Sequence, residues 1–428
     1  NPEEEAQAIA LLVREALETP RKRVAVVTPD RALARRVVHH LARWNVIADD
    51  SAGRPLSQTA AGRLVLLLAE TMAERAAPVP LMALLGHPLV DGEMERGTWL
   101  RHLRWIERDL RGPRKAGGLE PVQRLVAKKA EPDSDLAEWW RIVSDTLAPL
   151  LDLADCETVP LADLLDALAK ASESLCGEKL WAREDGRALA RFVEELRQNA
   201  GEAAFMLAPR EAEVALREAM EQVAVRPPYG GHARVQILGL LESRMNRADL
   251  VICAGLNEGV WPARGATDAL LAPPVLRTLG VPGSDYRIGL SAHDLAGALG
   301  APEVVLSRAE RDEGGPAIPS RFLLRVQALL GDLLPRHVET RAVDLARAIA
   351  RAPRAPIYPR PRPRPDADQR KVAISATALD RLLGDPYQFY AGQIMGLRDL
   401  DALDADPTPS WQGTVAHAIL QRWHEQRK

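Results

Sequence analysis

The stretch VQILGLLESR, from Val235 to Arg244, and the stretch ADLVICAGLNEGVWP, from Ala248 to Pro262, decide the fold of this chain. Each begins with or contains a short apolar run and ends in small and charged residues, which is typical of a buried parallel strand that leads into a polar loop. In open α/β sheets, ligands bind at the edge where the carboxyl ends of the strands meet. The two stretches therefore predict an α/β fold with a candidate site just after these strands.

Two further apolar runs extend the predicted sheet. Residues 23–30, RVAVVTPD, predict a buried strand followed by a turn in which Asp30 can cap the next helix. Another strand is expected at residues 303–307, and a polar loop is expected at 49–56. Because parallel connections are right-handed, we expect the strand at 23–30 to lie beside the others in one sheet.

Residues 80–206 have a different pattern, in which apolar residues recur at helical spacing without strand-like alternation. We interpret them as an all-helical insertion that splits the α/β domain. The expected divisions are 1–80 and 207–348 for the two parts of the α/β domain, 81–206 for the insertion, 349–372 for a linker, and 373–428 for the beginning of a C-terminal domain.

The composition narrows the classes of function. A chain of 428 residues with 46% hydrophobic residues can form two to four domains, and its formal net charge of -3 excludes a globally polycationic DNA-binding protein. The three cysteines lack metal-ligand spacing, and no apolar run of membrane-spanning length occurs, so we expect a cytoplasmic setting and no membrane. The chain begins without Met and stops within a helical pattern, which suggests a piece of a longer protein.

Local patches remain as candidates for DNA binding. Basic residues gather between Arg101 and Lys115, at Lys128 and Lys129, and in a proline-rich tether that carries five arginines between Arg351 and Arg364. Alternating prolines favour a stiff, extended tether, and a solvated basic linker is the alternative to phosphate binding there.

The helical insertion also contains tryptophans that could stack on the bases of single-stranded DNA. A path for single-stranded DNA across the insertion could combine these rings with nearby arginines. The alternative is that the rings pack one helix against another. The DNA-binding candidates are Arg101, Arg104, Arg111, Trp99 and Trp105.

The chain contains no Gly-x-x-x-x-Gly-Lys-Ser/Thr segment, which cradles the phosphates of ATP in motor ATPases. We therefore expect that this piece alone does not hydrolyse ATP.

The phrase GLNEGVWP at residues 255–262, together with LESR at 241–244, resembles the second motor-like domain of the AddB subunit of bacterial AddAB helicase-nucleases. The resemblance implies a RecA-like domain that follows an ATP-binding domain. It also implies that Gly239, Glu242 and Arg244 match one helicase motif, without its preceding Lys, and that Arg308 in LSRAE matches the arginine that reaches the γ-phosphate. A structural role is the alternative for Arg308. For Glu242 the alternative is that it pairs with Arg244 or with a helix terminus at the sheet edge.

The C-terminal residues resemble the beginning of the RecB-like nuclease domain that ends AddB. The phrases SATALDRLLGDPYQFY at 375–390 and GTVAHAIL at 413–420 carry this resemblance. It implies that Gly413, Thr414 and His417 belong to a partial nuclease motif in which His417 approaches a divalent metal. Asp385 stands where some relatives have a cluster-binding cysteine, so no iron-sulfur cluster is expected.

The resemblance implies that the parent protein uses ATP and Mg²⁺ and acts with an AddA-like subunit on broken DNA ends. This fragment itself is expected to hold no cofactor and to lack ATPase and nuclease activity alone. The alternative is an α/β scaffold that descends from a helicase fold and binds only protein.

Overall fold

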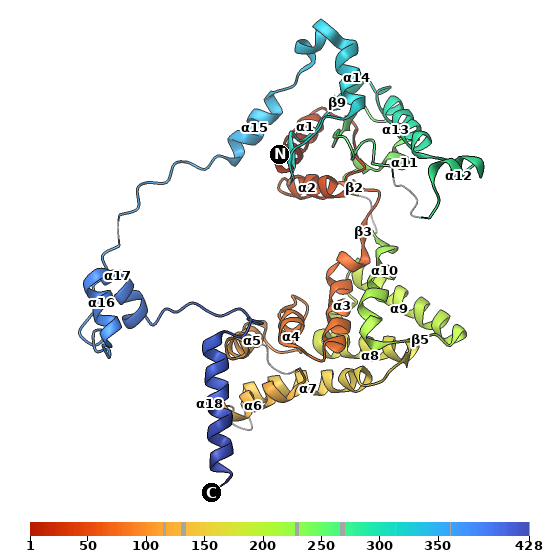
Figure 1. Ribbon diagram of the computed structural model, residues 1–428. Helices are drawn as coiled ribbons and strands as arrows, with labels where there is room; N and C mark the ends of the chain where they lie inside the picture. The colour runs from red at the N-terminus through yellow and green to blue at the C-terminus, as the bar shows by residue number, and fades with distance from the viewer. Residues whose placement is uncertain are drawn as a thin grey trace. The chain divides into compact units, whose positions relative to one another are not determined.

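The computed structural model describes residues 1–113, 117–129, 134–226, 231–265, 270–312, 314–359 and 361–427. The chain forms two compact units (Figure 1). We call Asn1–Gly53 with Arg226–Pro356 the α/β unit, and Arg54–Val225 with Ile357–Lys428 the helical unit.

The α/β unit is built on a five-stranded sheet in which every neighbouring pair is parallel. The strand order is β2-β7-β1-β8-β9. The strands are β1 (Val24–Val27), β2 (Asp49–Asp50), β7 (Val235–Leu238), β8 (Leu250–Cys253) and β9 (Glu303–Leu306). The expected α/β class with a parallel sheet is therefore confirmed.

The edge strand β2 lies where a loop was expected. Its two aspartates pair with Gln236 and Ile237 of β7. A strand of two polar residues is too short to show the alternation of apolar and polar residues that predicts a strand.

Alternate strand residues cover the two faces of the sheet. On one face, Val24, Val26 and Ile237 pack against α1 (Pro2–Leu17) and α2 (Arg31–Ala42). On the other face, Val27 and Cys253 belong to a cluster with Trp261 and Leu295, the latter from α13 (Ser284–Ala298). The remaining helices of this unit are α11 (Leu240–Ser243), α12 (Pro273–Thr278), α14 (Arg321–Leu330) and α15 (Arg341–Ala350). A short hairpin pairs β10 (Arg311–Asp312) with β11 (Gly315–Pro316).

Two helix starts have the capping residues that the sequence favours. Asp30 caps α2 because its carboxylate accepts from the N–H groups of Ala32 at 2.8 Å and Leu33 at 3.0 Å. Asn1 and Glu4 form a reciprocal capping box at the start of α1.

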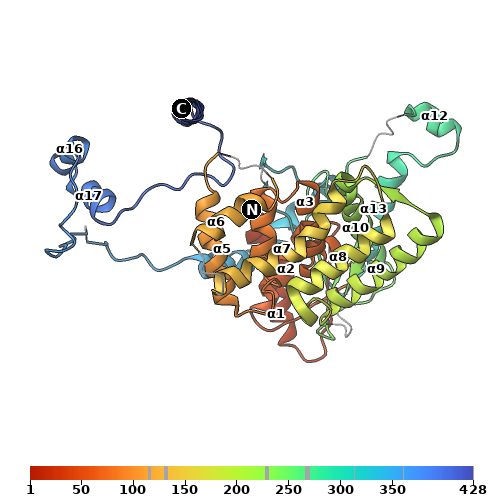
Figure 2. The same ribbon diagram turned by 90° about the horizontal axis from the view of Figure 1, so that it is seen from below.

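The helical unit has one large apolar core. Its helix α3 (Ala60–Ala73) is apolar over most of its surface and packs against α4, α8, α9 and α10. The other helices are α4 (Pro78–Gly86), α5 (Arg96–Leu110), α6 (Glu120–Lys129), α7 (Asp135–Ala154), α8 (Leu161–Cys176), α9 (Glu184–Ala203) and α10 (Ala212–Glu221). Figure 2 shows α7, α8 and α9 side by side. This unit extends beyond 81–206 on both sides, because α3 and α10 belong to its core.

Two short ladders of paired strands accompany these helices. One joins β4 (Val159–Pro160) to β5 (Met206–Leu207). The expectation of an all-helical insertion is therefore wrong at these residues. The other pairs β3 (Arg54–Pro55) with β6 (Ala224–Val225), where the chain enters and leaves the helical unit. Pairs of two residues leave no periodic signal in a sequence.

The C-terminal part is helical in the described residues. It contains α16 (Ala376–Gly384), α17 (Pro386–Phe389), a π-helical turn at Tyr390–Ile394, and α18 (Pro409–Glu425). The loop before α18 joins the end of α5: Gly112 donates to the carbonyl of Ala402 and accepts from the N–H of Ala405, both at 3.0 Å. Within the described residues, no helix has the length and apolar character needed to cross a membrane.

Candidate functional site

The carboxyl edge of the sheet brings together loops from three strands. Thr28 to Asp30 follow β1, the GLNEGVWP loop follows β8, and Ser307 and Arg308 follow β9. These three loops are neighbours, because β1, β8 and β9 are consecutive in the sheet. The GLNEGVWP loop therefore lies at the carboxyl edge, as expected.

Glu5 of α1 joins two of these loops. Its side-chain Oε1 accepts from the backbone N–H of Gly255 at 3.0 Å and from the hydroxyl of Ser307 at 2.7 Å. The residue is 8% exposed, and this burial raises the pKa of the Glu5 carboxyl, although the two hydrogen bonds oppose the shift. No local pattern predicts this contact, because Glu5 is one of three acidic residues in the first turn of α1.

We expect the pH dependence of stability to change in Glu5→Gln. A folded pKa above the ordinary value of 4.5 means that stability is fully present below that value and falls as pH rises through the raised pKa. The Gln side chain keeps an acceptor oxygen but carries no charge, so the stability of the variant should decline less over this range. Glu5→Leu leaves the Gly255 N–H without this acceptor and should cost about 1–3 kcal/mol. Urea unfolding at several pH values, followed by circular dichroism, measures both effects.

The control for this experiment is Glu18→Gln, an exposed residue at the end of the same helix. It should follow the wild-type profile. A Glu5→Gln profile that also parallels the wild type would show that the buried carboxyl does not titrate as described.

The GLNEGVWP loop is held in one conformation by its own residues and by the start of α14. Gly255 and Gly259 adopt φ values of +77° and +86°, which L side chains rarely adopt. The Trp261 side chain is fully buried, and its carbonyl accepts from the hydroxyl of Ser320. Glu258 forms an ion pair with Arg321 that includes a 3.0 Å bond from Nε. The loop is thus a rigid part of the sheet edge.

A pocket of about 340 Å³ lies at this edge. Its lining includes the carboxylates of Glu5, Asp30 and Glu258, and the guanidinium of Arg264. Arg308 stands nearby, but its Nη1 donates to the carbonyls of Ala309 at 3.1 Å and Ala317 at 3.3 Å, and to the Asn257 side chain at 3.4 Å. Arg308 therefore holds local backbone in this structure.

The other helicase-motif candidates lie at a different strand. Gly239 follows β7 and precedes α11, and Glu242 lies close to it on that short helix. Since β7 and β9 are separated by β1 and β8, the strand ends that carry Gly239 and Arg308 are about 14 Å apart at the usual strand spacing. The structure does not bring these candidates into one cluster.

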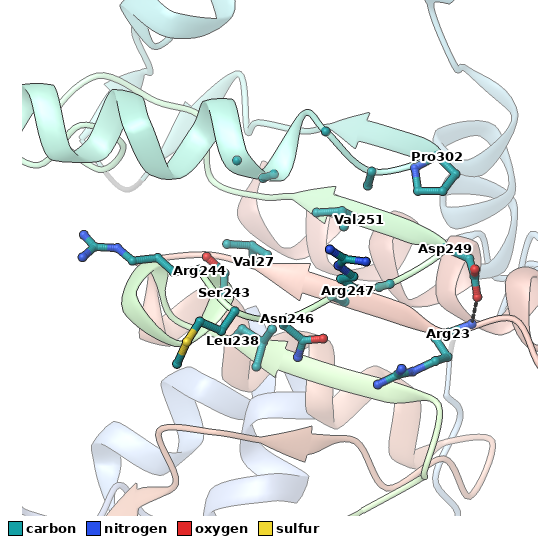
Figure 3. A pocket seen from close by; sticks show the side chains of 17 residues that line it. Arg23, Val27, Leu238, Ser243, Arg244, Asn246, Arg247, Asp249, Val251 and Pro302 are labelled. Carbon is teal, nitrogen blue, oxygen red and sulfur yellow. Dashed lines mark hydrogen bonds between the residues drawn. The ribbon is translucent and has the colours of Figure 1, made fainter.

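Arg244 is engaged with α13. Its Nε donates to Asp294 Oδ1 at 2.7 Å and its Nη2 donates to Oδ2 at 3.3 Å. This paired hydrogen bond to Asp294 raises the pKa of Arg244. Arg244 also lines an open pocket of about 820 Å³ beside the sheet (Figure 3).

The 820 Å³ pocket runs along a face of the sheet, from Val27 and Leu238, which end β1 and β7, to residues that precede the strands. Arg23, Asp249 and Pro302, which precede β1, β8 and β9, contribute to its lining. Figure 3 shows the hydrogen bond from the Arg23 N–H to Asp249, which measures 2.7 Å. The pocket therefore extends along the sheet and is not confined to the carboxyl edge, where α/β sheets bind ligands.

The α/β unit thus has charged side chains at its edge that mainly stabilise loops. In the described residues, no three His, Cys, Asp or Glu side chains gather in a group that could hold a metal ion.

The tryptophan candidates pack in the core of the helical unit. Trp99 is fully buried, donates from Nε1 to the carbonyl of Leu85 at 2.8 Å, and packs edge-on against Trp139 at 5.6 Å between ring centroids. Trp105 is half-buried against the same core. The burial of Trp99 excludes its ring from stacking on bases in this structure, and the helix-packing alternative describes it.

The arginine candidates differ in how they are held. Arg101 and Arg104 are exposed on α5, whereas Arg111 is half-buried, pairs with Glu107 and donates to the carbonyl of Asp401 at 2.8 Å. Arg108 is also exposed and shares the i, i+3, i+7 face with Arg101 and Arg104. Helical spacing could have identified this stripe from the sequence.

Other basic candidates are only partly described. Lys115, Arg360 and the side chain of Lys129 lie outside the described residues. In the tether, Pro361, Pro363 and Pro365 line a pocket of about 510 Å³ with aromatic residues of 386–390, so this part of the tether contacts the helices that follow it.

The partial nuclease motif lies on α18. Gly413 and His417 are one helical turn apart, His417 is exposed, and the Thr414 hydroxyl donates to the carbonyl of Ser410 at 3.0 Å. Asp385 caps α17 by accepting from the N–H groups of Tyr387 at 3.0 Å and Gln388 at 3.1 Å. Asp385 therefore has a structural role that its side chain suits.

Residues 373–428 match the family model of the PD-(D/E)XK nuclease superfamily. The match covers α16, α17 and α18 and confirms the expectation of nuclease-superfamily sequence at this end of the chain, consistent with a RecB-like nuclease.

One relative is a protein of Rickettsia conorii described as uncharacterized. It is 23% identical to this chain over 175 residues, which are 41% of this chain and 20% of that protein. This chain therefore corresponds to only part of the length of its relative.

Proposed function

We propose that this chain is part of an AddB-like subunit of a bacterial helicase-nuclease that processes broken DNA ends in the cytoplasm for recombinational repair. The observation that carries the proposal is the presence, on one chain, of a parallel-sheet unit with the GLNEGVWP loop at its carboxyl edge and a C-terminal nuclease-superfamily segment. In this proposal the α/β unit is a RecA-like domain, and the parent complex uses ATP and Mg²⁺.

The chain's own contribution is to hold DNA beside an AddA-like partner. The internal contacts of Glu258, Arg308 and Arg244 support a scaffold rather than an ATPase role. The exposed stripe of Arg101, Arg104 and Arg108 supports contact with phosphates, because arginine side chains bind them with paired donors. His417 remains a candidate metal ligand in the nuclease of the parent protein.

We expect the exchange of Arg101, Arg104 and Arg108 for Ala to weaken binding of single-stranded DNA at least tenfold at low salt. Each lost phosphate contact removes about 0.7 from the log-log dependence of affinity on salt, so three contacts remove about 2. Anisotropy of a labelled oligo-dT across a salt series measures both quantities with the full chain.

The matched control is the exchange of Arg183, Arg191 and Arg210 for Ala, which removes the same charge from exposed positions elsewhere in the helical unit. Control protein should bind as the wild type does. If the wild type fails to bind oligo-dT at low salt, or the two triple variants behave alike, the chain is better described as a scaffold that binds only protein.

A further inference from the structure

The helical unit contains a second basic feature, a pocket of about 480 Å³. Its walls come from β3, the turn that precedes α3, the first turns of α3, the residues after α4, and α10. Arginines approach it from three of these elements: Arg54 from β3, Arg63 from α3 and Arg217 from α10.

Two of the three arginines have no opposite charge beside them. Arg217 forms an i, i+4 ion pair with Glu213. Arg54 and Arg63 are exposed and form no ion pair with any described part of the chain. Two unneutralised guanidinium groups in one concave site attract an anion, because their donors are rigid, planar and permanently charged.

The charged groups of the lining leave a positive excess, because the lining has three arginines and one carboxylate, that of Glu70. Glu70 is the carboxylate among the lining residues, and burial, with help from Glu213 and Glu74, raises its pKa. His87 also lines the pocket; burial, Arg96 and Arg63 lower its pKa to about 4, so the ring is neutral at pH 7.

The start of α3 forms another wall of the pocket. Ala60, the first residue of this helix, lines the pocket, whereas the N–H groups of Ala61 and Gly62 already donate to Asp185 and Thr59, at 3.2 Å each. The helix start is fixed, since Thr59 caps it and the preceding Leu56 is fully buried. The pocket therefore combines a preformed shape with an excess of positive charge.

We propose that this pocket binds a phosphate group through Arg54 and Arg63. The phosphate comes either from the backbone of single-stranded DNA or from a free polyphosphate such as a nucleotide. The proposal goes beyond the proposed function, because it requires neither the partner subunit nor the nuclease-superfamily segment.

The experiment uses the full chain and two probes. Isothermal titration calorimetry measures binding of inorganic pyrophosphate, and anisotropy measures binding of labelled oligo-dT at low salt. The test variant is Arg54→Gln with Arg63→Gln. We expect it to weaken binding of pyrophosphate, of oligo-dT, or of both by about tenfold, because charge-assisted hydrogen bonds are lost.

A second variant guards against an effect of altered folding. Ala60→Glu adds a carboxylate at an exposed position of the pocket, and an acidic residue in the first turn is favourable for a helix. It should weaken phosphate binding to a similar degree while circular dichroism remains unchanged. The control, Arg183→Ala with Arg191→Ala, removes the same number of exposed arginines from α9 and the residue before it and should bind as the wild type does.

The two probes distinguish the source of the phosphate. Loss of pyrophosphate binding in the pocket variants supports a free polyphosphate, whereas loss of oligo-dT binding alone supports the DNA backbone. DNA binding that depends on the α5 stripe and not on the pocket, together with no pyrophosphate binding, would overturn this inference and leave the proposed function intact. Conversely, pyrophosphate binding without any DNA binding would support the pocket and count against the DNA-holding role.

Discussion

Gly62→Ala is expected to destabilise the helical unit by about 3 kcal/mol, the upper end of the usual cost of overpacking. A Cβ atom at this position of α3 would lie 1.9 Å from the carbonyl oxygen of Leu56 and 2.7 Å from its carbonyl carbon. This carbonyl cannot move freely, because it accepts from the Thr59 N–H at 3.0 Å and the Thr59 hydroxyl at 2.7 Å. The amide of Leu56 is fixed as well, by a 2.8 Å bond to the carbonyl of Val223.

The sign of this effect opposes intrinsic helix propensity, which favours Ala over Gly by about 1 kcal/mol. Gly201→Ala is the matched control, since Gly201 lies in α9 and a Cβ there meets no atom within 4 Å. The control should raise stability slightly, by about 0.5–1 kcal/mol. Urea unfolding followed by tryptophan fluorescence compares the variants; equal stability of both would contradict the close contact at Gly62.

Trp261→Ala should destabilise the α/β unit by about 3–5 kcal/mol, the range for removal of a buried aromatic side chain. The Trp261 ring is fully buried and belongs to the apolar cluster that joins the sheet to α13. Its Nε1 donates to the carbonyl of Ser291 at 3.3 Å, so the exchange also leaves an acceptor without its partner. We expect the GLNEGVWP loop to lose order with the side chain that anchors it.

Trp44→Ala provides the comparison within the same unit. Trp44 is half-buried on the opposite face, where the Arg14 guanidinium lies 5.8 Å from its ring centroid. Its removal should cost much less than removal of Trp261. Thermal unfolding measured by calorimetry, together with hydrogen exchange of the loop amides, tests both points; a smaller loss for Trp261→Ala than for Trp44→Ala would be incompatible with this packing.

Four strands of the sheet were predictable because each of them has a local sequence pattern. The strands β1, β7, β8 and β9 lie within the four apolar runs, and the cap at Asp30 follows from residue type and position. The contribution of β2 was not predictable, because two aspartates carry neither alternation nor an apolar run. Its position depends on pairing with β7, which is distant in the sequence.

The candidate site was only partly predictable. The loop that follows β8 could be placed at the carboxyl edge from general rules for α/β sheets. The contact of Glu5 with Gly255 and Ser307 could not, since it joins residues about 250 and 300 positions apart without any motif that requires it. Likewise, residue type alone did not distinguish the engaged Arg111 from the exposed Arg108 on one helix.

The ladder between β3 and β6 bears on the order of folding events. The two ends of the helical insertion are held side by side, with Arg54 opposite Val225 and Pro55 opposite Ala224. If the helical unit folds first, its two ends are already held together by the β3–β6 ladder. The pairing of β1 with β7 then costs little further loop-closure entropy. The rate at which β1 and β7 pair then no longer depends on the number of residues in the insertion. We expect the sheet to form as quickly as if the insertion were a short turn.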